Sequence, residues 1–224
     1  MEKELMREIV AWDVFNWSKA IDYWEKNTTI NNKGYECLEL GASKGGLSLW
    51  LALNNNKVLC TDLNGPEKDA YKLHEKYNCS SRISYDSMDA TNISYTDKFD
   101  LVVFKSILGR ISCHKNENKV NTINEIYKAL KPGGILLFAE NLEATYFHQV
   151  FRKGFGTKDW NYLKISEIDE VFSSFAKVNY TTTGFFGCFG RTEGQRSMLG
   201  KVDKLLEKVI PGKNKYILIG IAVK

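Results

Sequence analysis

Long apolar runs and an apolar leader are both missing from this 224-residue sequence. No apolar stretch approaches the roughly 18 residues that a membrane-spanning helix needs. Residues 1–8 are charged and contain no apolar core, which argues against a secretory signal. We therefore expect no membrane span, and we interpret the glycosylation sequons at Asn27 and Asn78 as chance occurrences in an Asn-rich chain.

Paired cysteines and clustered metal ligands are missing as well. The five cysteines are odd in number, widely spaced, and form no C-x-x-C pair. The three histidines lie far apart in the sequence, so the ligands of a zinc site are not brought together locally. We expect a reduced, cytoplasmic protein without a metal ion.

What remains is an ordinary globular composition. Hydrophobic residues make up 43% of the chain and charged residues 26%, which argues against wholesale disorder. A chain of this length buries roughly 70–75% of its unfolded surface, so it needs no disulfide or metal to hold a core. Because no repeat, linker or low-complexity segment interrupts it, we expect one domain over residues 1–224.

The net charge of +4 is unevenly distributed. Residues 1–143 carry 18 Lys and Arg against 20 Asp and Glu, whereas residues 144–224 carry 13 against 7. The basic final third suggests an anionic partner, although a solvated face rich in lysine is the commoner meaning of such a bias.

Short apolar segments alternate with helical patterns along the middle of the chain. Strands are predicted at 35–40, 57–61, 82–85, 99–104 and 135–139. Helices are predicted between them, at 47–53, 66–77 and up to Leu130, where Pro132-Gly133-Gly134 ends the last one. Continuous apolar strands separated by helices are typical of a doubly wound, mostly parallel α/β sheet with helices on both faces.

The two ends of the chain carry further elements. Val10, Val14, Trp17, Ile21 and Trp24 follow one another at spacings of four and three, which predicts a single helix within an N-terminal helical cap over residues 1–30. The final third predicts a helix over 166–175, a strand over 178–186, an amphipathic helix over 197–209 and a closing strand over 216–223.

The turn after the first strand reads Gly41-Ala42-Ser43-Lys44-Gly45. Gly41 permits a sharp turn, and Gly45 lets the backbone approach a ligand closely. The turn lacks the G-K-[ST] of a Walker A loop, and Ser43 replaces the second glycine of the dinucleotide fingerprint. Glu39, two residues before Gly41, disfavours phosphate and favours an ammonium group. Asp62 ends the next strand, where a carboxylate accepts hydrogen bonds from ribose hydroxyls.

The segment Cys37-Leu38-Glu39-Leu40-Gly41-Ala42-Ser43-Lys44-Gly45 resembles motif I of the class I (Rossmann-like) S-adenosylmethionine-dependent methyltransferases. Asp62, the segments 88–90 and 99–103, and Leu130 to Leu137 follow in the family's order. The one departure is Ser43, which stands where the motif has its middle glycine. The resemblance implies a seven-stranded sheet, a cofactor-binding core over 35–140, S-adenosylmethionine as cofactor, and a substrate-side elaboration with closing strands over 141–224.

The resemblance also implies roles for individual residues. Glu39 and the turn, with Gly41, Ala42, Ser43 and Gly45, would hold the methionine end of the cofactor. The remaining predicted cofactor residues are Asp62 and Leu63 at the ribose, Asp89 at the adenine amino group, Met88 and Ala90 beside the adenine ring, and Phe104 and Lys105 at the sulfonium. As alternatives, Asp62 and Asp89 are ordinary turn aspartates, and Lys105 is a solvated lysine.

Acceptor residues are expected after the fifth strand. His148 could remove a proton near neutral pH, or it could be a histidine on a helix surface. The segment 187–196 reads as a glycine-rich loop with two arginines, Arg191 and Arg196, which with Arg152 could bind an anion. The alternative for Arg191 is a surface ion pair with Glu193.

These observations favour methyl transfer to an oxygen or nitrogen of a small, anionic biosynthetic intermediate. The sequence lacks the Asn-Pro-Pro-Tyr type of motif that the superfamily often shows when it methylates exocyclic nitrogens, which lowers the case for nucleic acid. The alternatives are an RNA or protein methyltransferase that uses the basic final third with Phe151, Phe155 and Trp160 as a docking face, and a non-catalytic protein that binds S-adenosylmethionine. Nothing in the sequence names the acceptor or an oligomeric state.

Overall fold

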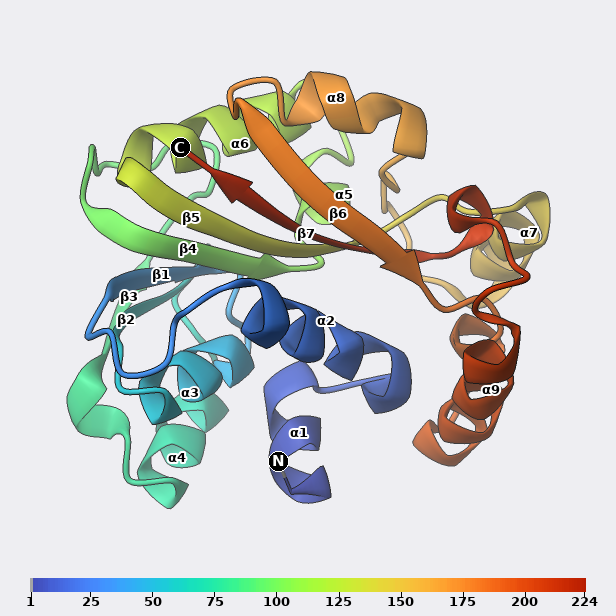
Figure 1. Cartoon of the computed structure of the whole chain (residues 1–224), viewed down its shortest axis with the longest axis horizontal. Coiled ribbons are helices and arrows are strands. Elements are labelled where there is room, and N and C mark those ends of the chain that lie inside the picture. The colour runs from blue at the N-terminus through green and yellow to red at the C-terminus, as the bar shows by residue number, and fades with distance from the viewer. Residues whose placement is uncertain (1) are drawn as a thin grey trace.

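The computed structural model describes residues 2–224 and contains a twisted seven-stranded sheet with the order β3-β2-β1-β4-β5-β7-β6 (Figure 1). The strands β1 to β5 pair in parallel, and β7 runs antiparallel to both of its neighbours. This confirms the predicted mostly parallel, seven-stranded sheet. The strand bounds are β1 Glu36–Leu40, β2 Lys57–Asp62, β3 Ile83–Ser87, β4 Phe99–Lys105, β5 Leu130–Asn141, β6 Lys177–Thr183 and β7 Ile217–Val223.

Helices cover both faces of the sheet (Figure 1). On one face lie α1 Lys3–Val10, α2 Val14–Asn27, α3 Gly46–Leu53 and α4 Lys68–Lys76; on the other lie α5 Leu108–Ile111, α6 Asn118–Ala129 and α8 Ile168–Val171. Beyond one end of the sheet lie α7 Tyr146–Phe155 and α9 Glu193–Leu206. Short 3-10 turns occur at η1 Ser80–Arg82, η2 Ile165–Glu167, η3 Gly187–Phe189 and η4 Gly212–Asn214. Within residues 2–224, no helix combines the length and apolar character that crossing a membrane requires.

Each face of the sheet packs its own hydrophobic core because side chains alternate along a strand. In β1, Cys37 belongs to the core that also buries Trp17, Trp24 and Trp50. Leu38 belongs to the opposite core, together with residues of α6 and α8. The same alternation decides which side chains at the strand ends reach a ligand site.

The predicted N-terminal helix is wrong in one respect: it is broken in two. Residue Ala11 has φ 65° and Asp13 has φ 44°, so the backbone leaves the helical region between α1 and α2. The Glu193 carboxylate accepts hydrogen bonds from the backbone N–H groups of Asp13 (2.9 Å) and Val14 (2.7 Å), which starts α2 afresh. Local periodicity does not contain this contact, because Glu193 comes from the far end of the chain.

Several other boundaries also differ from the sequence prediction; for example, α8 covers only Ile168–Val171 of the helix predicted over 166–175. Pro132-Gly133-Gly134 lie inside β5, which already begins at Leu130, paired with Phe99 of β4. The segment 187–196 is not an open loop: it contains η3 and the first turn of α9. The Thr192 hydroxyl accepts from the Gln195 N–H at 3.3 Å and so caps α9, which places Arg196 on a helix.

Candidate cofactor and acceptor site

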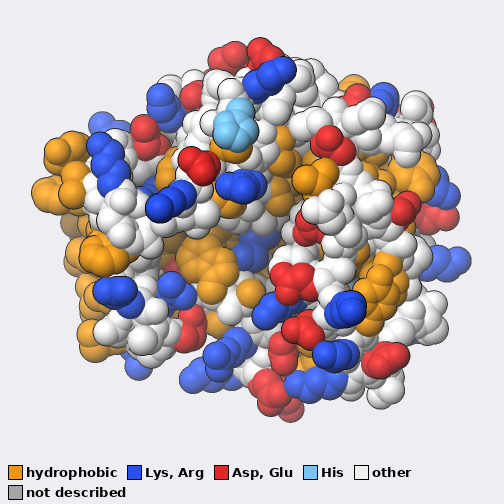
Figure 2. Space-filling view, turned by 180° about the vertical axis from the view of Figure 1, so that it is seen from behind, with side chains coloured by type: hydrophobic (Ala, Val, Ile, Leu, Met, Phe, Trp, Pro, Cys, Tyr) orange, Lys and Arg blue, Asp and Glu red, His pale blue; other side chains and the backbone are white. Residues whose placement is uncertain are grey.

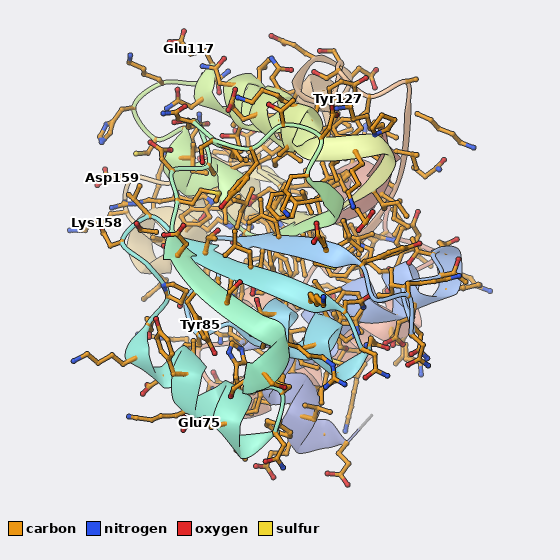
Figure 3. The ribbon with its side chains drawn as sticks, turned by 90° about the vertical axis from the view of Figure 1, so that its left-hand side faces the viewer. Glu75, Tyr85, Glu117, Tyr127, Lys158 and Asp159 are labelled. Carbon is orange, nitrogen blue, oxygen red and sulfur yellow. The ribbon has the colours of Figure 1, made fainter. Side chains whose placement is uncertain are left out.

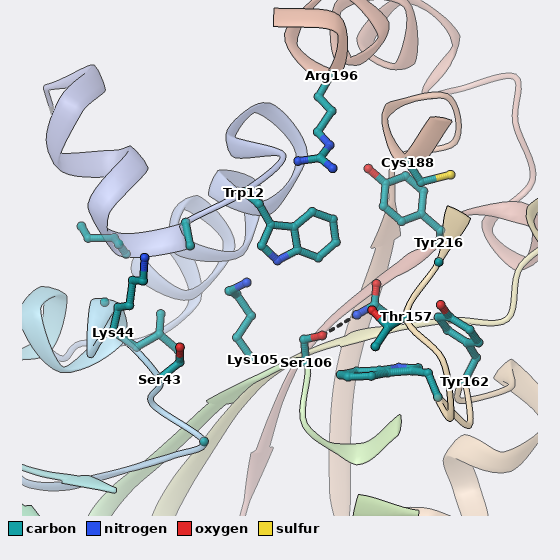
Figure 4. A pocket seen from close by; sticks show the side chains of 18 of the residues that line it. Trp12, Ser43, Lys44, Lys105, Ser106, Thr157, Tyr162, Cys188, Arg196 and Tyr216 are labelled. Carbon is teal, nitrogen blue, oxygen red and sulfur yellow. Dashed lines mark hydrogen bonds between the residues drawn. The ribbon is translucent and has the colours of Figure 1, made fainter. Parts of the chain in front are cut away.

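A cavity of about 570 Å³ lies where the turn after β1, the ends of β4 and β5, the α1–α2 junction, α7 and α9 meet. Seen from behind, the molecule is hollowed near its centre, with hydrophobic side chains inside and Lys and Arg side chains around them (Figure 2). Figure 4 shows the cavity at close range, with Ser43 and Lys44 on one side and Tyr162 and Tyr216 on the other. This placement brings the predicted cofactor turn and the predicted acceptor region into one continuous space.

The backbone of the turn after β1 requires glycine at two positions. Gly41 has φ +64°, and a Cβ there would lie 2.4 Å from Ile107 Cγ2. Gly45 has φ +70°, and a Cβ there would lie 2.6 Å from the ring of His74. A side chain at either position would therefore meet both an unfavourable backbone conformation and a neighbour.

Ser43 adopts the left-handed conformation that the motif's middle glycine would take, with φ 49°. Its N–H donates to Asp62 Oδ2 at 2.8 Å, and its hydroxyl donates to Glu67 Oε1 at 2.6 Å. These two hydrogen bonds hold a non-glycine residue in a conformation it rarely adopts. The departure from the motif is thereby accommodated.

His74 supports the same turn from α4, and the sequence analysis missed it. One ring nitrogen lies 2.8 Å from the Gly45 carbonyl oxygen and the other lies 2.8 Å from the Tyr85 hydroxyl. Tyr85 belongs to β3, and its ring packs against Tyr71 of α4 (Figure 3). Burial lowers the pKa of His74, so the neutral ring bridges the turn and the sheet. Nothing in the sequence spacing indicates this role, because His74 approaches Gly45 only through the packing of α4.

Glu39 is a buried carboxyl in the wall of the cavity. Its Oε2 accepts a hydrogen bond from the backbone N–H of Ser48 at 2.8 Å and another from the Ser48 hydroxyl. Burial raises its pKa to about 7, and the hydrogen bonds from Ser48 oppose that shift. A cationic group in the cavity would favour the carboxylate form, so the site suits the ammonium group of an amino acid.

The other predicted adenosine contacts lie outside this cavity, at the ends of β2 and β3. Asp62 pairs with Ser87 in the sheet, and the Asp62 carbonyl oxygen accepts from the N–H of Met88 at 2.9 Å. Asp62 Oδ1 also accepts from the Leu63 N–H at 2.8 Å. Asp89 is exposed and accepts from Thr91, while Ala90 is buried. Asp62 is the last residue of β2, and Asp89 follows the end of the neighbouring strand β3 by two residues, at the same carboxyl ends of the parallel strands.

At the end of β4, the structure separates the two residues predicted beside the sulfonium. Phe104 is fully buried and stacks on Phe138, in the core on the α6 side, so its predicted contact with the cofactor is not supported. Lys105 points the other way, into the cavity, because successive side chains of a strand alternate. Its Nζ lies 4.5 Å from the centre of the Trp17 ring and 5.3 Å from that of Trp12 (Figure 4).

Two of the three predicted anion-binding arginines line the cavity. Arg152 packs its guanidinium 3.9 Å from the centre of the Tyr162 ring and donates to the Leu142 carbonyl at 2.7 Å. Arg196 lies 5.5 Å from the centre of the Trp12 ring and donates to the Gly190 carbonyl at 3.0 Å. Arg191 is exposed, lies over the Phe155 ring at 4.8 Å, and is outside the cavity lining.

The geometry argues against the predicted role of His148 as a base. The side chain is fully buried and does not line the cavity. Its ring nitrogens face the Thr145 hydroxyl at 2.7 Å and the Phe185 carbonyl oxygen at 2.9 Å. Burial lowers its pKa to about 4, so the ring stays neutral and fixed between α7 and the segment after β6.

The cavity wall contains several aromatic residues, of which the sequence analysis named Phe151 and Trp160 only as part of a docking face for RNA or protein and missed the others. Trp12 reaches the cavity only because the helix breaks at Ala11 and Asp13. The others come from segments that are far apart along the chain: Phe151, Trp160, Tyr162 and Tyr216. Clusters of aromatic side chains around a few polar groups are typical of pockets for small molecules.

The comparisons with known proteins agree with this architecture. Residues 38–138 match a family model described as a methyltransferase domain. A search of curated protein sequences finds no match for this chain. Among solved structures, the phosphoethanolamine N-methyltransferase 2 of Haemonchus contortus, in complex with S-adenosyl-L-methionine, superimposes with a TM-score of 0.65 at 17% identity, over 93% of this chain and 52% of that one. The present chain thus spans about half the length of that enzyme.

For two other similar structures, the match covers a larger share of the other chain. The MccD protein gives a TM-score of 0.60 at 16% identity, over 92% of this chain and 96% of that chain. The [4+2]-cyclase SpnF gives a TM-score of 0.61 at 17% identity, over 92% of this chain and 80% of that chain. Identities this low establish the fold alone, and a cyclase among the neighbours shows that the fold does not dictate the reaction. The family match over residues 38–138 contains most of the motif from Cys37 to Gly45, and the sheet has the order described above, so this part of the chain is similar to a methyltransferase domain of the class I (Rossmann-like) S-adenosylmethionine-dependent kind.

Proposed function

We propose that the protein transfers the methyl group of S-adenosylmethionine to an oxygen or nitrogen atom of a small, anionic acceptor. One observation carries the proposal: a single cavity runs from the glycine turn after β1 to the side chains of Arg152 and Arg196. Methyl transfer requires the donor and the acceptor to be aligned within one space from which water is excluded.

The residues present fit the cofactor. Glu39 would hold the ammonium of the methionine end, and the backbone of the turn, with Gly41, Ser43 and Gly45, would lie against the methionine portion. Asp62 and Asp89 would take the ribose hydroxyls and the adenine amino group at the sheet edge. When bound, S-adenosylmethionine would supply an electrophilic methyl group. On this proposal, Asp62→Ala lowers the affinity for S-adenosylhomocysteine by about tenfold or more, because charge-assisted hydrogen bonds contribute about 1.5–3 kcal/mol each.

The cations in the cavity support an anionic acceptor. The lining carries Lys44, Lys105, Arg152 and Arg196 against the two carboxyls of Glu8 and Glu39. No carboxylate in residues 2–224 forms an ion pair with Arg152, and the nearest carboxylate oxygen of Glu193 is 3.8 Å from Arg196. An arginine held by carbonyl groups and an aromatic ring keeps donors for a carboxylate or phosphate.

The aromatic walls of the cavity support a small acceptor. Trp12, Phe151 and Trp160 restrict the space to about 570 Å³, within the range of small-molecule sites. A polynucleotide or a folded protein would have to insert a single side group between these rings. The experiment below distinguishes the proposal from two alternatives: a methyltransferase that acts on RNA or protein, and a non-catalytic protein that only binds the cofactor.

The test is transfer of a labelled methyl group from S-adenosylmethionine into a metabolite extract, followed by fractionation on an anion exchanger and mass identification of the product. We expect label in a small anionic product, and we expect Arg152→Met to abolish its formation at low acceptor concentration. Lys153→Met is the matched control, since it removes an exposed charge from the next position of α7. Label only in RNA or protein, or binding without transfer in several extracts, would contradict the proposal.

A further inference from the structure

Lys105 occupies the point where the two halves of the cavity meet. Phe104 of β4 pairs with Leu40 of β1, so the next residue, Lys105, stands level with Gly41 at the start of the cofactor turn. On its other side, Lys105 pairs with Ala139 of β5, one residue before Glu140. The side chain therefore rises from the centre of the sheet between the proposed cofactor turn and the acceptor region.

The amino group of Lys105 has indole rings for neighbours instead of a counter-ion. Its Nζ lies 5.3 Å from the centre of the Trp12 ring and 4.5 Å from the centre of the Trp17 ring. No residue in the described part of the chain, 2–224, forms an ion pair or a hydrogen bond with its Nζ. An amine in such a place lacks the partner that usually keeps a buried lysine charged.

The charges around Lys105 act in opposite directions. Burial lowers its pKa to about 8, whereas the carboxyls of Glu140, Asp13 and Glu39 raise it. The cations Lys44, Arg152 and Arg196 line the same cavity and oppose a further positive charge. The indole faces favour the ammonium form, so both protonation states are accessible near neutral pH, as a group that accepts and returns a proton requires.

The other titratable groups of the region are committed elsewhere. Glu140 accepts hydrogen bonds from the backbone N–H groups of Ile107, Leu108 and Asn141. The Tyr216 hydroxyl donates to the carboxyl of Asp13. Lys105 is thus the group at the junction whose lone pair has no partner within the described residues.

We propose that Lys105 is the base that takes the proton from the methyl acceptor. The inference rests on the proposed function. The neutral amine accepts the proton of the acceptor's hydroxyl or ammonium group, and the lone pair of that oxygen or nitrogen forms the new bond to the methyl carbon. The carbon–sulfur bond breaks and its electron pair stays on sulfur, giving S-adenosylhomocysteine. The Lys105 ammonium then returns the proton to solvent after the product leaves.

This role has a consequence for cofactor binding that needs no acceptor to observe. A sulfonium beside Lys105 repels an ammonium, so S-adenosylmethionine must bind with Lys105 as the neutral amine. The neutral sulfur of S-adenosylhomocysteine makes no such demand. Both ligands carry the same amino acid end, so any proton taken up or lost by Glu39 is common to both and cancels in their comparison.

The experiment is a pair of calorimetric titrations of the full chain, one with each ligand, between pH 6 and 9 in buffers of different protonation enthalpy. We expect S-adenosylmethionine to release a proton that S-adenosylhomocysteine does not release. Because one proton is linked to binding, the affinity of S-adenosylmethionine relative to S-adenosylhomocysteine should rise about tenfold for each pH unit up to the pKa of Lys105 near 8 and level off above it.

Three variants make the comparison specific. Lys105→Met, which keeps an unbranched side chain, should abolish both the extra proton release and the pH dependence of the affinity ratio. Lys105→Arg, which cannot lose its charge in this range, should weaken S-adenosylmethionine relative to S-adenosylhomocysteine at every pH. Lys33→Met, the matched control, removes an exposed lysine that is outside the cavity lining and should leave the proton release unchanged.

An affinity ratio that does not vary with pH in the wild type, or one that Lys105→Met leaves unaltered, would overturn the inference. Failure of both ligands to bind would instead overturn the proposed function. With the acceptor found in the extract experiment, Lys105→Met should lower kcat by about 10²–10⁴-fold, with a cofactor affinity close to that of the wild type above pH 8. An unchanged kcat with the same acceptor would also overturn the inference.

Discussion

The two halves of the cavity are built in different ways. The cofactor half consists of one turn and the strand ends next to it, so Glu39, Gly41 and Gly45 lie within a few residues of one another. The acceptor half draws Trp12, Arg152 and Arg196 from three distant parts of the chain. A motif can be read from the first kind of site, whereas the second kind exists only after the chain has folded.

A network of hydrogen bonds to one buried carboxyl, that of Asp203, holds the acceptor half together. Asp203 of α9 accepts hydrogen bonds from the N–H groups of Phe185 and Phe186 at 3.0 and 2.7 Å, from that of Gly187 at 3.0 Å, and from the Asn16 side chain at 2.9 Å. Asp203 thereby joins α9 to α2 and to the segment after β6. The cofactor half contains no part of this network among the described residues.

The largest expected effect comes from breaking this network. Asp203→Asn places an amide NH₂ among groups that are already donors, so the free energy of unfolding should fall by about 3 kcal/mol. Chemical denaturation would measure the loss. Affinity for S-adenosylhomocysteine should stay within twofold of the wild type, since the cofactor turn is untouched. A large loss of cofactor affinity in a folded variant would show that the two halves are not independent.

The next largest effect is expected for Glu39, whose contribution to the free energy of unfolding changes with pH. Burial raises the pKa of Glu39 in the folded protein to about 7. Between about pH 4.5 and 7, the carboxyl is therefore protonated in the folded protein but ionised in the unfolded chain. This carboxyl therefore lowers stability as pH rises through that window. Glu39→Gln should gain about 2 kcal/mol relative to the wild type between pH 5 and pH 7, measured by denaturation at both values. A difference independent of pH would contradict the buried, protonated carboxyl.

A smaller effect is expected for the glycine that starts the cofactor turn. Gly41→Ala and Gly34→Ala place an alanine at almost the same backbone conformation, φ +64° and +65°, but only position 41 has a neighbour in the way. Gly41→Ala should therefore cost about 1–2 kcal/mol more than Gly34→Ala. It should also weaken S-adenosylhomocysteine binding. Thermal denaturation of the two variants separates backbone strain from the clash with Ile107, and calorimetry measures the binding of S-adenosylhomocysteine. Equal losses of stability in the two variants would contradict the predicted clash.

The smallest effect is expected at Arg191. This side chain is exposed and outside the cavity, so Arg191→Ala should change stability by less than about 0.5 kcal/mol and leave the KM of the acceptor unaltered. Arg196→Ala should raise that KM, and Arg196→Lys should restore it only in part, because an ammonium lacks the planar pair of donors. A strong defect in Arg191→Ala would show that the acceptor extends beyond the cavity.

The sequence predicted much of the fold and the position of the cofactor turn, because both depend on local signals. Strand hydrophobicity places β1, β2 and β4 to within a residue or two, and Asp62 is found at the strand end where the spacing put it. Phe104 and Lys105 were predicted to face the same ligand, although neighbouring residues of a strand point to opposite faces. That error could have been avoided from the strand period alone.

The rest depends on contacts between distant residues. His148 is a plausible base in the sequence. In the structure it is buried, and its hydrogen bonds with Thr145 and Phe185 hold its ring outside the cavity. Conversely, Trp12 is unremarkable in the sequence and becomes a wall of the site because Glu193 interrupts the helix beside it. Neither outcome follows from neighbouring residues alone, because His148 also depends on Phe185 and Trp12 on Glu193.

The hydrogen bonds from Asp13 and Val14 to Glu193 span 180 and 179 positions of the chain. During synthesis, the first turn of α2 therefore lacks its cap until Glu193 has left the ribosome. The parallel strands β1 to β5 have all their partners among residues up to 141 except at the edge that β7 covers, so they can pair earlier. The α1–α2 junction is thus made before the strands β1 to β5 but reaches its final conformation after them, and the acceptor wall at Trp12 closes only when α9 docks.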